Sequence, residues 1–319
     1  TPAPTIAPQG LSRSNPFPKS EIVATQNWEV QVIDVFRGAE AWKVIQAANM
    51  FNEEAPDGME YLLIKLHVKN LSTDNEEHDI GNCDFFVTGD RYTRYTCSMV
   101  MVVAPEPKLD AKLYSGGETE GWVVFPVAIG ERNLMLAVDE LFSFSDDQNR
   151  YIALEDGAKL FVDPELSTIL PSNIGIDRKN PASIDETITT EDWEFYIVDT
   201  LVGDEALAKI QEANQFNDPP EDGMQYILVK VHVRNIGTED TYTNIDAGSF
   251  NITGSKGVLY DLPFTVPPDP NLNIYLFPSG EYEGWIVLQS AKDEKGLILV
   301  FDPLFDFSNK NQRFVSLEK

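Results

Sequence analysis

The sequence predicts an all-β protein of two tandem domains, each a β-sandwich or β-barrel with one inserted helix. The first observation is a repeat: residues 57–70 (DGMEYLLIKLHVKN) return as residues 222–235 (DGMQYILVKVHVRN), with nine of fourteen positions identical. The second is that short alternating segments separated by turn residues fill both halves of the chain. The third is that each half has one helical segment, too few for the helix-covered parallel sheet of an α/β protein.

The repeated segment reads as a strand with one buried face. Its alternate positions are apolar, and Lys65, His67 and Lys69 fall between them, which is the period-two pattern of a half-buried strand. We therefore expect one set of side chains to be buried in each copy: Leu62, Ile64, Leu66 and Val68 in the first, and Ile227, Val229, Val231 and Val233 in the second.

The repeat begins before this strand and continues to the end of the chain. Strands are expected at 28–35 and 193–198, each opening on a tryptophan, and hairpins are expected over 84–96 and 249–260, with turns at Gly89-Asp90 and Gly254-Ser255. Further matches join 10–16 to 175–181, 115–122 to 278–285, 141–145 to 304–308, and 150–154 to 313–317. Each copy thus holds about seven or eight short strands.

One helix is expected in each copy, over residues 39–51 and 204–216. Apolar residues recur there at every third position: Trp42, Ile45, Ala48 and Phe51, then Leu207, Ile210, Ala213 and Phe216. Such a stripe is typical of a helix packed over one end of a sheet. A partner-binding face is the other interpretation.

The repeat defines the domain organisation of the 319 residues. Residues 10–154 form the first copy, residues 175–319 the second, and the apolar residues 155–174 a packed linker. Residues 1–9 (TPAPTIAPQ) form a Pro/Thr-rich tether without a core. Such tethers commonly follow an export signal or a lipid anchor, so we expect an extracellular or cell-surface-anchored protein, with a possible lipid anchor upstream.

Charge and hydropathy exclude some partners. The chain has 24 basic and 52 acidic residues and a formal charge of −28. Nucleic acid and anionic membranes repel such a body. No apolar run approaches the length that crosses a bilayer, so we expect no membrane insertion of these residues.

Four motifs recur in the same order in both copies. They are the Gly-x-x-Arg-x-Asn-Pro entries at Gly10 and Gly175, the Trp28 and Trp193 strands, the Asp-Gly-x-x-Tyr strands ending at Asn70 and Asn235, and the Gly-Glu-x-Glu-Gly-Trp entries ending at Trp122 and Trp285. In these motifs the chain resembles two copies of a bacterial exported domain of unknown function, with the immunoglobulin-like fold of the immunoprotective extracellular antigens. The resemblance implies two tandem immunoglobulin-like antiparallel β-sandwiches, secreted or surface-anchored, with no established catalytic residues.

The carboxylates best placed for chemistry are two pairs of glutamates: Glu118 and Glu120, and Glu281 and Glu283. Spaced by two on a strand, each pair would point one way, as a glycosidase pair does. They flank a glycine-rich turn that gives no reason for two different pKa values, so we expect no catalytic residues.

Metal and cofactor sites are not expected either. The three histidines are scattered, and no phosphate-binding or dinucleotide motif is present. The acidic turns at residues 217–222 and at Asp146-Asp147 are the alternative, as oxygen ligands for Ca²⁺.

The two cysteines, Cys83 and Cys97, predict a disulfide. They are symmetric about Asp90, so a three-residue turn at residues 89–91 would set them opposite each other. Gly248 and Leu262 take their places in the second copy, so the fold does not require the bridge. Two buried thiols in a reducing compartment are the alternative.

The leading functional interpretation is a non-enzymatic exported or cell-surface binding or scaffold module that contacts a protein or a glycan. One alternative is a secreted hydrolase using the paired glutamates. Another is a surface carrier that binds a small ligand between the two domains. A deep pocket with convergent polar groups would favour either alternative.

Overall fold

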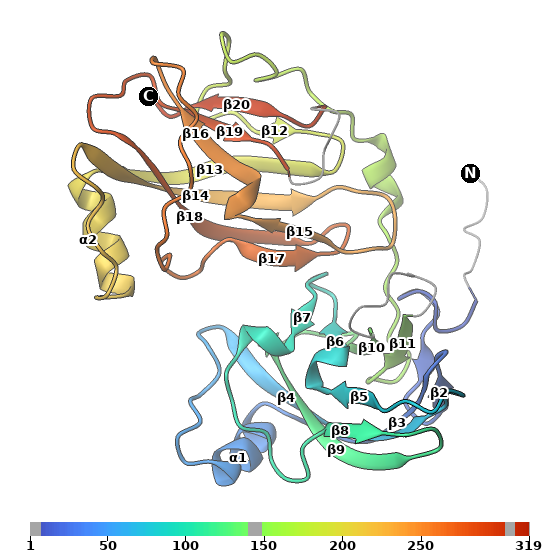
Figure 1. Ribbon diagram of the computed structural model, residues 1–319. Helices are drawn as coiled ribbons and strands as arrows, with labels where there is room; N and C mark the ends of the chain where they lie inside the picture. Colours follow the sequence, from blue (N-terminus) through green and yellow to red (C-terminus); the bar gives the residue numbers. More distant parts are fainter. Residues whose placement is uncertain (1–7, 140–148, 304–309, 319) are drawn as a thin grey trace. The chain divides into compact units, whose positions relative to one another are not determined.

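The computed structural model describes residues 8–139, 149–303 and 310–318. The chain divides into two compact units, Thr1–Phe161 and Val162–Lys319, each containing one copy of the repeat (Figure 1). The expected linker is divided between them: Leu160 packs with Met135 in the first unit, and Leu166 is buried in the 3-10 helix η4 (Pro164–Thr168). Most of the expected tether and the Asp146-Asp147 turn lie outside the described residues.

The first unit is a sandwich of two sheets around one core. One sheet has the strand order β2-β3-β4-β9, the other has the order β1-β11-β10-β6-β7, and a two-stranded sheet pairs β5 with β8. Among the described strand pairs, β1 with β11 is parallel and the others are antiparallel. The strands are β1 Phe17–Pro18, β2 Ile22–Ala24, β3 Trp28–Arg37, β4 Met59–Asn70, β5 His78–Gly81, β6 Phe85–Thr88, β7 Tyr95–Thr96, β8 Asp110–Leu113, β9 Glu118–Ala128, β10 Met135–Val138 and β11 Arg150–Ala153.

The second unit repeats this plan. Its sheets have the orders β12-β13-β14-β18, β16-β19-β20 and β15-β17. The strands are β12 Ile188–Thr189, β13 Trp193–Val202, β14 Met224–Asn235, β15 Thr243–Asp246, β16 Phe250–Thr253, β17 Asn273–Leu276, β18 Glu281–Ala291, β19 Ile298–Phe301 and β20 Arg313–Ser316. The prediction of two β-sandwiches, each with one inserted helix, is confirmed.

The repeated strands β4 and β14 run through the middle of their sheets. All eight apolar side chains predicted to be buried are buried. The first residues of β4 depart from the alternating pattern, since Tyr61 and Leu63 are buried as well. Helix α1 (Ala39–Ala48) covers this end of the sheet and packs Ala41 and Ile45 on them, so both faces are buried there (Figure 1).

The helices lie where predicted, but their buried stripe differs from the prediction. Helix α1 ends at Ala48, before Phe51, and α2 (Asp204–Ala213) ends before Phe216. The buried residues of α2 are Ala206 and Ile210, four apart, because a helix of three turns presents a single i, i+4 pair to the sheet. The predicted burial of Phe51 and Phe216 is wrong: they are 82% and 83% exposed.

The hairpin of the first unit is wider than the predicted three-residue turn. Val87 pairs with Tyr95 and Phe86 with Thr96, so the hairpin is centred on Arg91 and not on Asp90. A buried carboxylate is bound to this loop: Glu131 Oε1 accepts a hydrogen bond from the backbone N–H of Arg91 at 2.8 Å. The connection between β6 and β7 is therefore a longer loop that hydrogen-bonds to Glu131, and not a tight turn.

Candidate functional site

The predicted glutamate pairs lie on the outer face of the sheets and form cross-strand ion pairs. Glu120 Oε2 is 2.7 Å from Lys65 Nζ, and Glu118 Oε2 is 3.8 Å from His67 Nε2. The second unit repeats both contacts, with Glu283 against Lys230 and with Glu281 Oε2 3.6 Å from His232 Nε2. The structure thus places each glutamate beside a basic side chain of the central strand.

These surroundings do not suit an acid catalyst. The hydrogen bond from Lys65, with its charge, holds the pKa of Glu120 below its ordinary value, whereas a glycosidase acid needs a raised pKa. Exposed ion pairs of this kind contribute little to stability, because water and salt screen them. These four contacts are best explained as structural ion pairs between neighbouring strands on the surface of the sheets.

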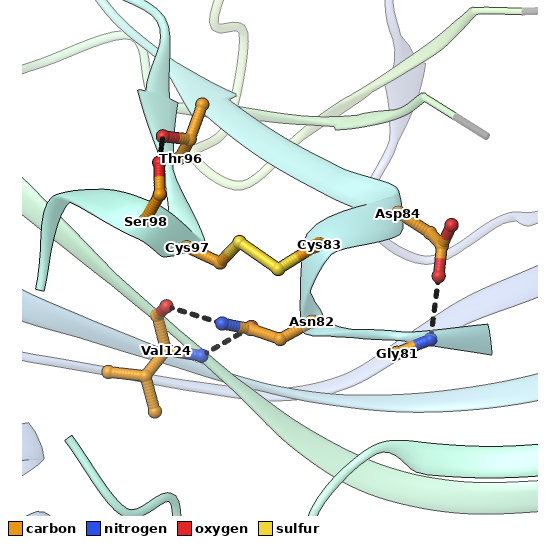
Figure 2. Close-up of a disulfide and its surroundings, with 8 residues drawn as sticks. All are labelled: Gly81, Asn82, Cys83, Asp84, Thr96, Cys97, Ser98 and Val124. Atoms are coloured by element: carbon orange, nitrogen blue, oxygen red, sulfur yellow. Dashed lines mark hydrogen bonds between the residues drawn. A yellow bond between two sulfur atoms is a disulfide. The ribbon is translucent and has the colours of Figure 1, made fainter. Parts of the chain in front are cut away.

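A disulfide joins Cys83 to Cys97, with an S–S distance of 2.04 Å and a Cα–Cα distance of 5.4 Å. Figure 2 shows that it connects two 3-10 turns, η1 (Asn82–Asp84) and η2 (Cys97–Met99), which flank β6 and β7. The predicted location opposite each other within the hairpin ladder is wrong. The ladder is centred one residue later and ends before either cysteine, so the turns bring the sulfurs together.

The turn η1 is fastened to the edge of β9. The Asn82 side-chain amide donates to the Val124 carbonyl oxygen at 3.1 Å and accepts from the Val124 N–H at 2.9 Å (Figure 2). Asp84 Oδ2 accepts from the N–H of Gly81 at 2.7 Å. Because the disulfide links Cys97 to Cys83, it also holds η2 and the segment that follows η2 close to β9.

A cavity of about 570 Å³ lies beside the disulfide. It is bounded by β5 and β8, by the edge of β9, and by residues 100–104 after η2. Its apolar lining includes Ile80, Leu109, Trp122 and Val124, and its polar lining includes three aspartates and a lysine: Asp79, Asp84, Asp110 and Lys108. Apart from the two cysteines, none of these residues was predicted from the sequence to belong to a site.

A second feature that sequence reasoning missed is a pair of loops held together beside each helix. In the first unit, Asn52 Nδ2 donates to the carbonyl oxygens of Ile45 and Val103, at 2.8 and 2.9 Å, and Asn52 Oδ1 accepts from the Val103 N–H at 2.8 Å. Three exposed apolar side chains lie on these joined loops: Phe51, Met101 and Val103. We call them the first apolar loop pair.

The second unit has the same arrangement. Asn217 Nδ2 donates to the carbonyl oxygens of Ile210 and Val266, each at 2.9 Å, and Asn217 Oδ1 accepts from the Val266 N–H at 2.9 Å. The second apolar loop pair presents Phe216, Phe264 and Val266, all exposed. The acidic turn proposed as a Ca²⁺ site therefore begins with an asparagine whose side-chain oxygen binds backbone.

Buried carboxylates also occur at matching places, in structural roles. Glu131 accepts from the Tyr95 hydroxyl at 2.6 Å, and burial raises the pKa of Glu131 above its ordinary value. Its counterpart Glu294 accepts from the Tyr260 hydroxyl at 2.6 Å and also from Ser255 and the N–H of Lys256. The Tyr260 hydrogen bond is the largest cause that lowers the pKa of Glu294 to about 2.

The described residues hold no group of three His, Cys, Asp or Glu side chains that could bind a metal ion. None of the helices in the described part of the chain is long and apolar enough to cross a membrane.

The fold defines a tandem β-sandwich protein with one disulfide. The chain belongs to the family described as Domain of unknown function (DUF4352), whose model matches residues 18–149 and 182–312, once in each unit. The expected resemblance to two copies of a bacterial domain of unknown function is thereby confirmed. Among curated proteins, none matches the sequence significantly.

Solved structures that match part of the chain include three bacterial proteins. One is ycdA of Bacillus subtilis subsp. subtilis str. 168, named as a putative lipoprotein (15% identity, TM-score 0.31, covering 42% of this chain and 38% of that chain). Another is yjhA of Bacillus subtilis (14% identity, TM-score 0.29, covering 44% of this chain and 99% of that chain). A third is an uncharacterised β-sandwich protein of Clostridium difficile 630 (11% identity, TM-score 0.28, covering 48% of this chain and 100% of that chain). The chain spans well under half of ycdA.

Proposed function

We propose that this protein is a non-enzymatic binding module, exported or held at the cell surface, that contacts a partner protein through its two apolar loop pairs. The observation that carries the proposal is the duplication of these loops. The same three positions are apolar and exposed in both units, and an asparagine holds them in the same way. Exposed apolar patches on a rigid support mark interaction surfaces.

The rigid support matters for affinity. Each asparagine joins its loop to the last turn of the helix and to the facing loop, so the phenylalanine side chains are presented on an ordered backbone. Less conformational entropy is then lost when a partner binds. Large apolar side chains near the centre of an interface contribute most of its binding energy.

Charge narrows the kind of partner. Acidic residues follow both phenylalanines, namely Glu53, Glu54 and Asp57 in the first unit and Asp218, Glu221 and Asp222 in the second, and all are exposed. No basic residue lies in residues 49–58 or 214–223. The complementary partner is a protein with an apolar depression bordered by Lys and Arg.

The disulfide supports export, because cytosolic reductants keep most thiols reduced. The strongly negative surface suits a protein that stays soluble outside the cell.

The test is binding of the purified chain to purified cell-envelope proteins and to purified cell-wall glycans from a bacterium that carries it. The double variant Phe51→Ser, Phe216→Ser should weaken binding to a basic protein partner by about tenfold or more. Tyr114→Ser removes an exposed aromatic side chain elsewhere and should leave the affinity unchanged. Equal binding by the double variant, or binding to glycans alone, would overturn the proposal.

The carrier alternative has one specific observation in its favour, which is the cavity. It lies inside the first unit, between elements of one sandwich.

A further inference from the structure

We propose that the cavity of the first unit binds a small organic cation: a primary or quaternary ammonium group carried on a compact apolar body. The proposal does not depend on Phe51 and Phe216, the phenylalanines of the proposed function, which do not line the cavity; Val103 of the first apolar loop pair does line it.

The cavity is large enough for such a ligand, and its floor is apolar. Its volume of about 570 Å³ is within the range of small-molecule sites. Ile80, Leu109 and Val124 are each only 2% exposed and form a preformed apolar surface. The indole of Trp122 is part of the lining and is held by stacking on Phe36, with ring centroids 5.4 Å apart. An apolar body is desolvated here without rearrangement of the protein.

The rim provides the attraction for a positive charge. Three carboxylates, Asp79, Asp84 and Asp110, and one lysine, Lys108, line the cavity. Asp79 is also 3.4 Å from Lys112 Nζ, outside the lining, and Asp84 accepts from the N–H of Gly81. The ion pairs Asp110–Lys108, at 2.6 Å, and Asp79–Lys112 join four side chains that are each more than half exposed, so both pairs are weak and a ligand ammonium can replace a lysine. An aromatic face beside carboxylates is a favourable setting for an organic ammonium.

The second unit is an internal comparison. It keeps the floor, with Ile245, Leu272, Trp285 and Val287 at the corresponding positions, but replaces the three aspartates by neutral residues, Asn244, Ser249 and Asn273. Residues 243–249 and 273–276 contain one acid, Asp246, in the place of Gly81, and its carboxylate accepts from the N–H of Gly248 at 2.8 Å. The acidic rim is therefore a property of the first unit and not of the fold.

The second unit also shows what the tryptophan at this position can bind. The ammonium nitrogen of Lys209 lies 4.8 Å from the centroid of the Trp285 ring. The first unit has Val44 in the place of Lys209, and Trp122 lines the cavity. A cation from the chain itself contacts the aromatic ring in the second unit; in the first unit the ring lines a cavity together with three carboxylates, where a cation from solution can take that place.

The disulfide gives the site a fixed wall. Cys83 and Cys97 both line the cavity, and the bridge ties η2, and through it residues 100–104, to the turn anchored on Val124 (Figure 2). The second copy has Gly248 and Leu262 at these positions. The second unit therefore lacks both the disulfide and the three aspartates that line the cavity of the first unit.

The test applies to the full chain four aromatic probes of similar size and different charge: 2-phenylethylammonium, benzyltrimethylammonium, 2-phenylethanol and 3-phenylpropanoate. Binding is followed by calorimetry and by the indole N–H signals of isotope-labelled protein. The two ammonium probes should bind at least about tenfold more tightly than the alcohol, and the carboxylate should not bind. The Trp122 indole signal should shift, and that of Trp285 should not.

Variants then locate the site. Ala104→Trp, which fills the cavity, should abolish binding, and Asp110→Asn should weaken it about threefold or more, with Glu118→Gln as the exposed-acid control. The Phe51→Ser, Phe216→Ser variant should bind the ammonium probes like the wild type, which separates this proposal from the proposed function. Absence of saturable binding, equal binding of all probes, or an unchanged Trp122 signal at saturation would overturn it. The Trp122 readout is made on the wild type, so a failure of Ala104→Trp to fold leaves the result decisive.

Discussion

Removal of the Cys83–Cys97 bridge should destabilise the first unit and leave the second unchanged. The bridge closes a loop with a sequence separation of 14. By the chain-entropy relation, a loop of this length restricts the unfolded state by about 3 kcal/mol at 25 °C. In a unit the size of Thr1–Phe161, each kcal/mol shifts Tm by about 2–4 °C, so the expected loss is about 6–12 °C.

The assay is differential scanning calorimetry of the wild type, of the reduced protein, and of the Cys83→Ser, Cys97→Ser variant. Serine keeps the side chains small, and the bridge is partly exposed, so little cavity cost is added. The second unit has its own core and no cysteine, so its transition serves as the control within the same molecule. A thiol titration of the unfolded, non-reduced protein should find no free thiols.

Two outcomes would refute this reasoning. Two free thiols per chain in the titration would mean that the bridge does not form in the protein. An equal Tm shift in both transitions, or none in the first, would mean that the bridge does not restrict the first unit alone.

Three further predictions concern the matched features of the two units. Asn52→Ala and Asn217→Ala should each destabilise their own unit by about 1–3 kcal/mol, because backbone groups lose their partners, and denaturant unfolding with unit-specific probes measures this. The pKa of Glu294 is about 2 in the folded protein against 4.5 ordinarily, so the stability that this carboxylate gives the second unit should be present above about pH 4.5 and lost as the pH falls toward 2. Glu294→Gln should therefore remove the fall in the second unit's stability between these pH values, and an unchanged fall would contradict the assignment. Hydrolytic assays on glycan, peptide and ester panels should show no turnover, and activity lost in Glu120→Gln or Glu283→Gln would establish the hydrolase instead.

The sequence by itself determined the features that depend on local periodicity and on internal repetition. The alternation from Leu62 to Val68 predicts which face of β4 is buried, because successive side chains of a strand point to opposite faces. The recurrence of the same motifs at an offset of 165 residues shows that the chain contains two domains of the same architecture. The existence of one helix per copy followed from the same reasoning, although its end and its buried face did not.

The tertiary structure decided everything that depends on contacts between distant segments. Tyr61 and Leu63 are buried because α1, Val124 and the segment 100–104 pack with them. Asn52 reaches Val103 across a sequence separation of 51, so no local pattern could show that Phe51 stands exposed on a fixed loop. The disulfide pairing was predictable from two cysteines alone, but its place in two turns and in a cavity wall depends on how β6, β7 and β9 come together. Side-chain hydrogen bonds and shared cavities are set by the folded chain, and the spacing of residues along the sequence carries no direct record of them.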